Sequence, residues 1–236
     1  MSKVTLITGA SSGIGLALCE QLFTDNSDHH VYGLDRKPQE FFLNNPNYTH
    51  LCCDLLDFES VKTIIEGSGI NKVKINTIVN CAGIMPTSPV FKLDPKLASE
   101  AFSLNCIAPL YLVKLLLKSL TRTEKPLIIN VTSIAAELNI PGEIVYGATK
   151  AALKHASESM SIELARFGIR VNCVAPALVM TAMTEHLTES QIDYMHTKQA
   201  YKNEVTSKDV AIAINYLMDG PDVITGSTLY VGGIAR

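Results

Sequence analysis

Short apolar runs alternate with longer segments of helical periodicity along the whole chain. Apolar runs rich in β-branched residues favour buried strands, whereas apolar positions three and four residues apart favour helices. The pattern predicts strands over residues 3–8, 30–34, 48–53, 74–80, 127–131, 169–175 and 226–231, and helices over residues 14–24, 58–66, 97–120, 146–167 and 207–218. This alternation predicts an α/β fold in which helices cover both faces of a parallel sheet.

The pattern continues without an internal repeat, a low-complexity tract or a linker, so one domain is expected over residues 1–236. Residues 182–206 mix polar and apolar side chains, and we expect them to form a mobile lid over a substrate. The helix over residues 207–218 is expected to be capped, with Ser207 followed by Asp209.

The predicted helix over residues 97–120 is apolar almost all the way round. Such a helix is buried on every side, so we expect one face on the sheet and another against a second subunit. Pro109, in mid-helix, cannot donate to the carbonyl of Asn105, so a kink with a free carbonyl that holds a water is expected there. The apolar positions are Phe102, Leu104, Ile107, Leu110, Leu112, Val113, Leu115, Leu116 and Leu117.

Composition and charge narrow the function. The chain has 236 residues, of which 47% are hydrophobic and 18% charged, as in globular proteins. A net charge of −3 gives no bulk basic field, so neither nucleic acid nor a membrane is expected as a partner. We find no apolar run of membrane-spanning length, and the first strand begins too early for a signal or transit peptide. A cytoplasmic protein is therefore expected.

The six cysteines include no C-x-x-C pair, and most lie in apolar segments. This pattern favours buried, reduced thiols over a disulfide framework or a zinc site. No metal is expected.

A glycine-rich loop, T-G-A-S-S-G-I-G over residues 8–15, lies between the first predicted strand and helix. This is the context of a loop that binds phosphate at a helix N-terminus. Gly9 permits the tight turn, Gly13 allows backbone amides to approach a pyrophosphate, and Gly15 allows the helix to pack closely. A simple glycine-serine turn is the alternative.

Asp35 ends the second predicted strand, 35 − 15 = 20 residues after Gly15. An acid at this offset accepts hydrogen bonds from the adenosine ribose of NAD and repels the 2′-phosphate of NADP. Arg36 acts in the opposite direction, because its guanidinium can pair with that phosphate. NAD is therefore expected, with NADP as the alternative, unless Asp35 is a solvated acid at a strand end.

Two further predicted strands end in polar or small residues. Asp54 follows the strand over residues 48–53, and it either accepts from an adenine amine or, like Asp57, caps the next helix. The sequence N-C-A-G follows the fourth strand at residues 80–83. Gly83 would let a cofactor pass over the strand end, and Asn80 is expected to brace the backbone.

A hydroxyl, a phenol and an amine occur close together at Ser133, Tyr146 and Lys150. Tyr146 and Lys150 are four residues apart on a predicted helix, so they lie on one face. An ammonium there is expected to lower the pKa of the phenol, which could then exchange a proton with an alcohol or carbonyl oxygen. Ser133 follows a predicted strand and could bind the same oxygen. Taken alone, Y-x-x-x-K also occurs by chance in helices.

Together, the order and spacing of these motifs resemble the short-chain dehydrogenase/reductase (SDR) family over essentially the whole chain. The resemblance implies a Rossmann fold, a doubly wound sheet of seven parallel strands, and a homodimer or homotetramer. It implies that Tyr146 is the catalytic acid/base, that Lys150 lowers its pKa and that Ser133 orients the substrate oxygen. Asn105 matches the residue that holds a water of the proton relay. The implied cofactor-binding residues are Gly9, Ser11, Ser12, Gly13, Ile14, Gly15, Asp35, Arg36, Asp54, Leu55, Asn80, Ala82, Gly83, Tyr146, Lys150, Pro176, Val179 and Thr181.

The chain departs from this family at two places. The usual Pro-Gly after the sixth strand is Pro176-Ala177, and a positive φ would be costly at Ala177. The ending Y-V-G-G-I-A-R lacks the acid that many relatives carry before the last glycine. Neither departure removes a catalytic group, so an active enzyme is expected.

The expected reaction is hydride transfer between a nicotinamide cofactor and a carbonyl or secondary alcohol, and the substrate stays open. Candidates are a 3-oxoacyl-type reductase, a dehydrogenase of cyclic diols or dihydrodiols, and a small-ketone or sugar dehydrogenase. A regulatory protein that binds NAD(H) without turnover is the alternative of a different class. The residues expected to face the substrate are mostly apolar, which mildly disfavours a carrier-bound acyl group. They are Ile84, Met85, Ala135, Ile140, Glu143, Met180, Met183 and Leu187.

Overall fold

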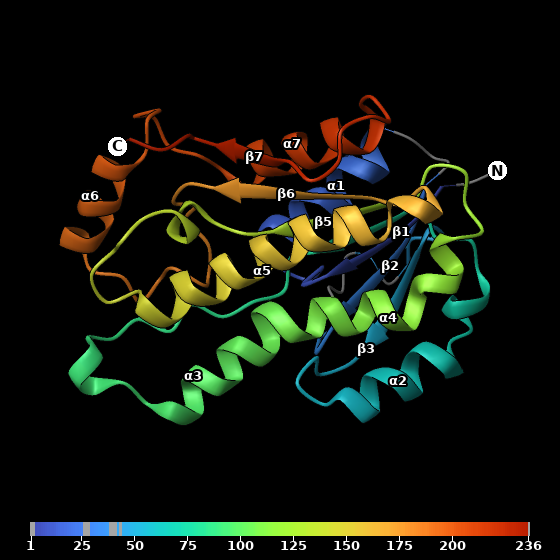
Figure 1. The fold of residues 1–236 in the computed structure, drawn as a ribbon, viewed down its shortest axis with the longest axis horizontal. Helices are drawn as coiled ribbons and strands as arrows, with labels where there is room; N and C mark the ends of the chain where they lie inside the picture. The colour runs from blue at the N-terminus through green and yellow to red at the C-terminus, as the bar shows by residue number, and fades with distance from the viewer. Residues whose placement is uncertain (1–2, 26–28, 38–41, 43, 236) are drawn as a thin grey trace.

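The computed structural model describes residues 3–25, 29–37, 42 and 44–235 (Figure 1). Its centre is a seven-stranded sheet in the order β3-β2-β1-β4-β5-β6-β7. Every pair of neighbouring strands is parallel. The strands are β1 (Lys3–Thr8), β2 (His29–Asp35), β3 (Tyr48–Cys52), β4 (Thr77–Asn80), β5 (Leu127–Val131), β6 (Arg170–Pro176) and β7 (Thr228–Val231). The predicted α/β fold with a parallel sheet is confirmed.

Helices follow most of the strands. The longer ones are α1 (Gly13–Asp25), α2 (Phe58–Gly67), α3 (Pro95–Phe102), α4 (Ala108–Leu120), α5 (Ile144–Glu163), α6 (Glu189–Lys198) and α7 (Ser207–Asp219). Short 3-10 turns are η2 (Ile70–Lys72), η3 (Val90–Lys92), η5 (Ile134–Ala136) and η6 (Ala165–Phe167), and η4 (Ser103–Ile107) is a π turn.

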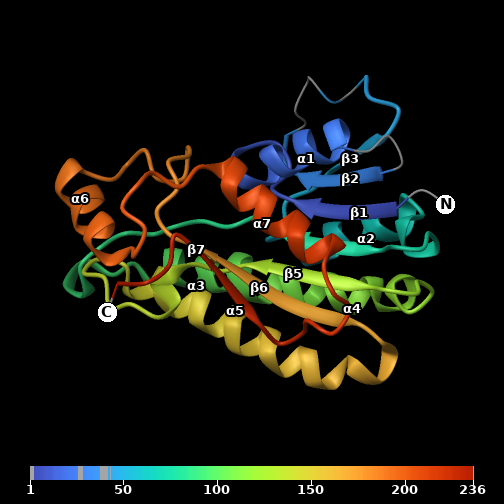
Figure 2. The same cartoon turned by 90° about the horizontal axis from the view of Figure 1, so that it is seen from above.

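The two faces of the sheet are buried in separate apolar layers. Neighbouring residues along a strand point to opposite faces, so Leu6 and Ile128 lie in one layer and Ile7 and Ile129 in the other. The layer of Ile7 includes residues of α1 and α7, and these helices pack side by side (Figure 2). The opposite layer includes residues of α2, α4 and α5. Burial on both faces explains why the strands are nearly continuous apolar runs.

The strand order reverses beside β1, which pairs with β2 on one side and β4 on the other. In a doubly wound sheet, the loops after these strands separate and leave a crevice at their carboxyl ends. The glycine-rich loop follows β1, and the N-C-A-G segment follows β4. The fold therefore brings the two motifs to the same edge of the sheet.

The long predicted helix is α3 and α4 joined through the π turn. Ala108 donates its backbone N–H to the carbonyl of Ser103, five residues back. Pro109 has no N–H, so the carbonyl of Asn105 lacks its ordinary helical donor. The expected kink thus takes the form of a π turn.

The same helix corrects the expectation about membrane-spanning length. Among the described residues, the stretch Pro95–Leu120 is long and apolar enough to cross a membrane by length and composition, and 39% of its most apolar 18-residue window is buried. In this fold its buried residues, such as Leu112 and Leu116, pack on the sheet. It therefore serves as a core helix here.

Some predicted boundaries move for identifiable reasons. The fourth strand begins at Thr77 and not at residue 74, because Ile75 donates to the Ser119 carbonyl and leaves the ladder. The cap of α7 is Thr206 and not Ser207: its hydroxyl accepts from the Asp209 N–H, and the Asp209 carboxylate accepts in return.

Candidate active site

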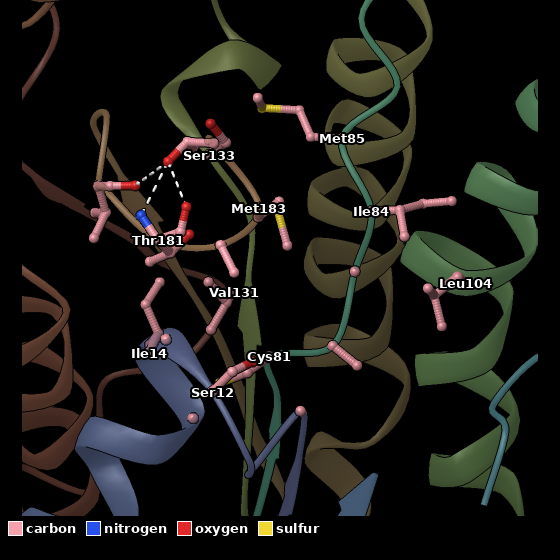
Figure 3. Close-up of a pocket in the computed structure, with 18 of the residues that line it drawn as sticks. Ser12, Ile14, Cys81, Ile84, Met85, Leu104, Val131, Ser133, Thr181 and Met183 are labelled. Atoms are coloured by element: carbon pink, nitrogen blue, oxygen red, sulfur yellow. Dashed lines mark hydrogen bonds between the residues drawn. The ribbon is translucent and has the colours of Figure 1, made fainter. Parts of the chain in front are cut away.

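A cavity of about 360 Å³ lies at the carboxyl ends of β1, β2, β4, β5 and β6. Figure 3 shows Ser12 and Ile14, at the start of α1, at one end, and Ser133 and Met85 at the other. Most of the predicted cofactor residues line it, namely Gly9, Ser12, Gly13, Ile14, Gly15, Asp35, Arg36, Asp54, Leu55, Ala82, Gly83, Tyr146, Lys150, Pro176, Val179 and Thr181. Ser11 and Asn80 are not among the lining residues: the Ser11 hydroxyl donates to Asp35, and the Asn80 amide donates to Asn130.

The glycines of the first loop make room for a bound phosphate group and for the loop itself. Gly9 has a φ of +68° and Gly13 a φ of +52°, which other residues rarely adopt. A Cβ at Gly15 would lie 2.2 Å from the Gly9 carbonyl oxygen, so Gly15 packs against the loop more than against the strand. Helix α1 begins at Gly13 on the cavity wall, where its first N–H groups favour an anion.

Asp35 holds this loop in place. Its Oδ2 accepts hydrogen bonds from the Ser11 hydroxyl at 2.5 Å and from the Ser11 N–H at 3.2 Å. Its Oδ1 accepts from the Arg36 N–H at 2.7 Å. Asp35 and Arg36 both line the cavity, so the carboxylate faces the space and also shapes the loop beside it.

The remaining polar residues at this end have distinct partners. Asp57 caps α2 by accepting from Ser60 N–H at 3.0 Å, whereas Asp54 accepts from Leu56 N–H at 2.9 Å and lines the cavity. Asn80 is buried and donates to Asn130 Oδ1 at 2.7 Å, so the partner found for it is a side chain of β5 and not the backbone that it was expected to brace.

Ser133, Tyr146 and Lys150 all line the substrate end of the cavity. Ser133 follows β5 and caps η5, with its Oγ accepting from Ala135 N–H at 3.1 Å. Tyr146 and Lys150 lie one turn apart on α5, both buried, and Lys150 Nζ is 5.8 Å from the tyrosine ring centroid. The structure thus brings together the three groups that the sequence singled out.

The expectation that the phenol has a lowered pKa is wrong. Burial raises the pKa of Tyr146 to about 12, a hydrogen bond with Ser133 opposes this, and Glu143 adds to it. Burial also lowers the pKa of Lys150 to about 8, while nearby thiols such as Cys81 raise it. Lys150 Nζ donates to the Val131 carbonyl at 2.8 Å and not to the phenol. Sequence spacing cannot show this, because it does not reveal the burial of either group.

Asn105, in the π turn, connects three parts of the site. Its Oδ1 accepts from Ile84 N–H at 2.9 Å, and its Nδ2 donates to the Ile84 carbonyl at 2.8 Å and to the Thr149 hydroxyl at 2.9 Å. A Cβ at Gly83 would lie 3.0 Å from Asn105 Oδ1 and 3.6 Å from Lys150 Nζ. Gly83 therefore keeps an open path beside Lys150.

The residues expected to face the substrate divide into two groups. Ile84, Met85 and Met183 line the cavity. The others are not among its described lining residues: Ala135, Ile140 and Leu187 pack with Met85 and Tyr146 in an apolar cluster, Glu143 is buried beside them, and Met180 is 45% exposed. Lining residues that the sequence reasoning missed include Leu104, Thr184 and Met195. Met195 lies in the predicted lid. Its place on the cavity wall depends on packing against residues distant in the chain, which the neighbouring sequence does not indicate.

Ala177, which stands where the family usually has glycine, shows no backbone strain. The costly positive φ considered for this position does not occur. Among the described residues, every positive φ belongs to a glycine, so Ala177 has an ordinary backbone conformation. Gly232 has the positive φ instead, at +92°, and a Cβ there would lie 2.7 Å from the Ala177 Cβ. The missing acid near the C-terminus removes no group from the cavity lining described here.

The described residues fit a dinucleotide better than a metal. Within them, no group of three or more His, Cys, Asp and Glu side chains could hold a metal ion. A glycine turn, a helix start, an acid at the end of β2 and a lysine beside an open glycine all line one cavity. These groups could hold the phosphates, the adenosine ribose and the second ribose of a nicotinamide cofactor.

Comparison with known proteins agrees with this arrangement. Residues 3–192 match the short chain dehydrogenase family. The chain belongs to the short-chain dehydrogenase family. A 3-oxoacyl-[acyl-carrier-protein] reductase of Haemophilus influenzae is 30% identical over 235 residues, with 98% of this chain and 97% of the relative covered. Carbonyl reductase family member 4 of Xenopus laevis is 28% identical, with 99% and 98% covered.

Solved structures of other family members have the same fold. A 4-hydroxyisoleucine dehydrogenase complexed with NADH superposes with a TM-score of 0.90 at 25% identity, covering 98% of each chain. ElxO with NADP bound superposes with a TM-score of 0.85 at 25% identity, covering 98% of this chain and 97% of that one. As a short-chain dehydrogenase, the chain is an oxidoreductase that transfers hydride with NAD or NADP on a single Rossmann-type sheet.

Proposed function

We propose that the chain interconverts a carbonyl and a secondary alcohol, with Tyr146 as the acid/base. When bound, the nicotinamide supplies or accepts the hydride. Tyr146 gives a proton to the substrate oxygen during reduction and removes it during oxidation, and Ser133 hydrogen-bonds that oxygen. Lys150 holds the nicotinamide ribose and supports the proton transfer, and Asn105 positions the loop after β4 and a water of the relay.

The observation that carries this proposal is that Ser133, Tyr146 and Lys150 all line one cavity with the glycine-rich loop. The test is cofactor oxidation or reduction with a panel of carbonyls and alcohols. Tyr146→Phe is expected to abolish turnover and leave NAD(H) binding nearly intact, whereas Lys150→Met is expected to reduce both. Activity of Tyr146→Phe within tenfold of wild type would refute the assignment, and binding without turnover in the wild type would indicate a sensor.

For the cofactor we infer a preference for NAD over NADP. The Asp35 carboxylate lies on the cavity wall at the end of β2, where the ribose of the adenosine half is expected. A 2′-phosphate there would meet an anion in a partly desolvated site. Arg36 also lines the cavity, but it is exposed and can turn toward solvent. Its guanidinium is the group through which NADP would be accepted.

For the substrate we infer a small or medium-sized molecule with an apolar body. The cavity wall near Ser133 is formed by Ile84, Met85 and Met183, without a lysine or arginine cluster at that end. Residues 182–206 would close over this end as a lid, since Met183 and Met195 both line the cavity.

A second candidate is a 3-oxoacyl thioester, favoured by the similarity to the Haemophilus influenzae reductase. An acyl chain would suit the same apolar wall. The panel should therefore include 3-oxoacyl thioesters, cyclic diols and small ketones, and the ratio of kcat/KM values would decide among them.

A further inference from the structure

One buried acid lies beside Tyr146 and has no part in the reaction proposed above. Glu143 is the N-cap residue of α5, three residues and about one turn before Tyr146. Glu143 is 4% exposed and Tyr146 8%. Among the described residues, Glu143 Oε2 has no hydrogen-bond partner. A carboxyl buried in this way costs stability, so a compensating role is expected.

A polar residue just before a helix ordinarily caps that helix with a side-chain hydrogen bond, and among the described residues Glu143 does not. Glu143 occupies the N-cap position of α5, yet within the described chain its side chain makes no capping hydrogen bond. Burial raises the pKa of Glu143 to about 7. The carboxyl therefore changes its charge near neutral pH.

Glu143 lies where α5 meets the loop after β4. The carbonyl of the preceding residue, Gly142, accepts from Ser88 N–H at 2.8 Å. On either side of Glu143 along the chain, Ile140 and Tyr146 pack in the apolar cluster that contains Met85. The carboxyl is thus enclosed at the N-terminal end of the helix that carries the phenol and outside the described cavity lining, so it can act on the reaction through the charge that it places near Tyr146.

Two negative charges in such surroundings oppose each other. An ionised Glu143 disfavours the phenolate of Tyr146 and favours the neutral phenol, and this contribution is one cause of the raised pKa of Tyr146. The neutral phenol donates the proton in a reduction, and the phenolate accepts it in an oxidation.

We propose that Glu143 is a positioning residue for the proton: its carboxylate holds Tyr146 in the protonated form and extends the pH range of carbonyl reduction. The inference rests on the proposed role of Tyr146. Other ionisable groups around the pair are Lys150 on α5, the thiols near Lys150, and His186 of the lid, whose Nε2 lies 3.2 Å from Thr87 Oγ1. The thiols are Cys81, Cys106 and Cys173.

The test compares pH profiles of kcat/KM for one substrate pair in both directions, in wild type, Glu143→Gln, Glu143→Asp and His186→Gln. In Glu143→Gln, the loss of reduction at high pH and the rise of oxidation should both move to lower pH, by roughly half a unit to one unit. Glu143→Asp and His186→Gln should move them less. If Glu143→Gln does not fold, Glu143→Leu takes its place, because it removes the same charge.

A second measurement does not depend on turnover. Ultraviolet difference titration of phenol ionisation, with Tyr146→Phe subtracted, should show Tyr146 ionising at lower pH in Glu143→Gln. If Tyr146 proves not to be catalytic, this shift should still be found. Unchanged titration and unchanged profiles in folded Glu143→Gln would overturn the proposal. So would a rise in KM confined to substrates with a second hydroxyl or an amine, which would make Glu143 a substrate ligand.

Discussion

Asn105 and Ile84 bond to each other in both directions, with Oδ1 accepting from the Ile84 N–H at 2.9 Å and Nδ2 donating to its carbonyl at 2.8 Å. The side chain of the π turn thereby replaces the backbone partners that Ile84 lacks after β4 ends. Because Ile84 lines the cavity next to Gly83, this pair connects the shape of the central helix to the shape of the site.

We expect Asn105→Ala to leave both backbone groups of Ile84 without their partner. Loss of bonds to buried polar groups costs about 2–3 kcal/mol in the free energy of unfolding. We expect kcat/KM to fall tenfold or more, because the loop beside Lys150 loses its position. Denaturant unfolding and steady-state kinetics would check both effects. Asn44→Ala, which removes an exposed amide outside the cavity lining and the lid, is the control, and equal losses in the two variants would contradict the prediction.

The contact between Ala177 and Gly232 predicts non-additive mutations. Gly232→Ala should destabilise strongly, since the new Cβ would lie 2.7 Å from that of Ala177 at a φ of +92°. Ala177→Gly alone should cost about 1 kcal/mol. In the double mutant the clash with Ala177 should disappear, whereas the backbone strain and the 3.0 Å approach to Val205 Cγ2 should remain, so its loss should be smaller than the sum. Strict additivity in a double-mutant cycle would refute the contact.

Asp35 is expected to set cofactor choice through charge. Two like charges in a partly desolvated site cost on the order of a few kcal/mol, which corresponds to roughly a ten- to thousandfold preference for NAD. Asp35→Ala should relax this preference, and Arg36 should then favour NADP. The measurement is kcat/KM for both cofactors. Ser11→Ala is the matched control, because it removes the hydroxyl contact to Asp35 and keeps the carboxylate. A wild-type preference for NADP would show that Arg36 decides.

The exposed apolar side chains of α3, the π turn and α5 predict self-association. Phe102, Ile107 and Ile162 are 38%, 48% and 81% exposed. The first two belong to the central helix, on which the sequence places apolar residues on every side. We expect these faces to pack against their copies about a two-fold axis, as a homodimer or homotetramer. Ile162→Glu should weaken the assembly, and Val223→Glu, which charges an exposed residue elsewhere, serves as control. A stable wild-type monomer at micromolar concentration in light scattering would refute the expectation.

The sequence predicted the strands and their connections well because both faces of the sheet are buried. Such strands are apolar runs, and their boundaries are marked where the apolar pattern stops. The run over residues 127–131 matches β5 at both ends. The predicted start of β4 is wrong because Lys74, Ile75 and Asn76 alternate polar and apolar side chains as a strand does, whereas the Ile75 N–H donates to the Ser119 carbonyl of a distant helix.

Side-chain chemistry was harder to predict than side-chain position. The spacing of Tyr146 and Lys150 placed both groups on one face, as found, but gave the wrong sign for the pKa of the phenol. The direction of the pKa shift depends on the burial of the phenol and on which acceptor Lys150 Nζ binds. Tertiary packing determines both, since Lys150 donates to the Val131 carbonyl of β5. Likewise, Pro109 indicated a missing donor, whereas the π turn depends on which carbonyl accepts from Ala108.

The last prediction concerns stability and pH at Glu143. Its pKa is raised from the ordinary 4.5 to about 7 in the folded chain, because it is buried. Between these values the folded state holds a proton that the unfolded state has released. Stability should therefore fall as pH rises from about 4.5 to about 7, by up to about 3 kcal/mol. Lys150, with a pKa lowered to about 8, acts in a separate window, where stability rises between about 8 and 10.5.

Glu143→Gln removes the acid and should therefore remove the loss of stability between pH 4.5 and pH 7. The variant should thus gain stability relative to wild type at pH 7.5 and gain little at pH 4.5, because only the ionised carboxyl is penalised by burial. Urea unfolding at both pH values would measure the difference. Glu163→Gln, at an exposed position on the same helix, should leave the pH dependence of the wild type unchanged. If wild type and Glu143→Gln lost the same stability between the two pH values, Glu143 would not be a buried acid that ionises near neutral pH, and the electrostatic role proposed for it beside Tyr146 would lose its support.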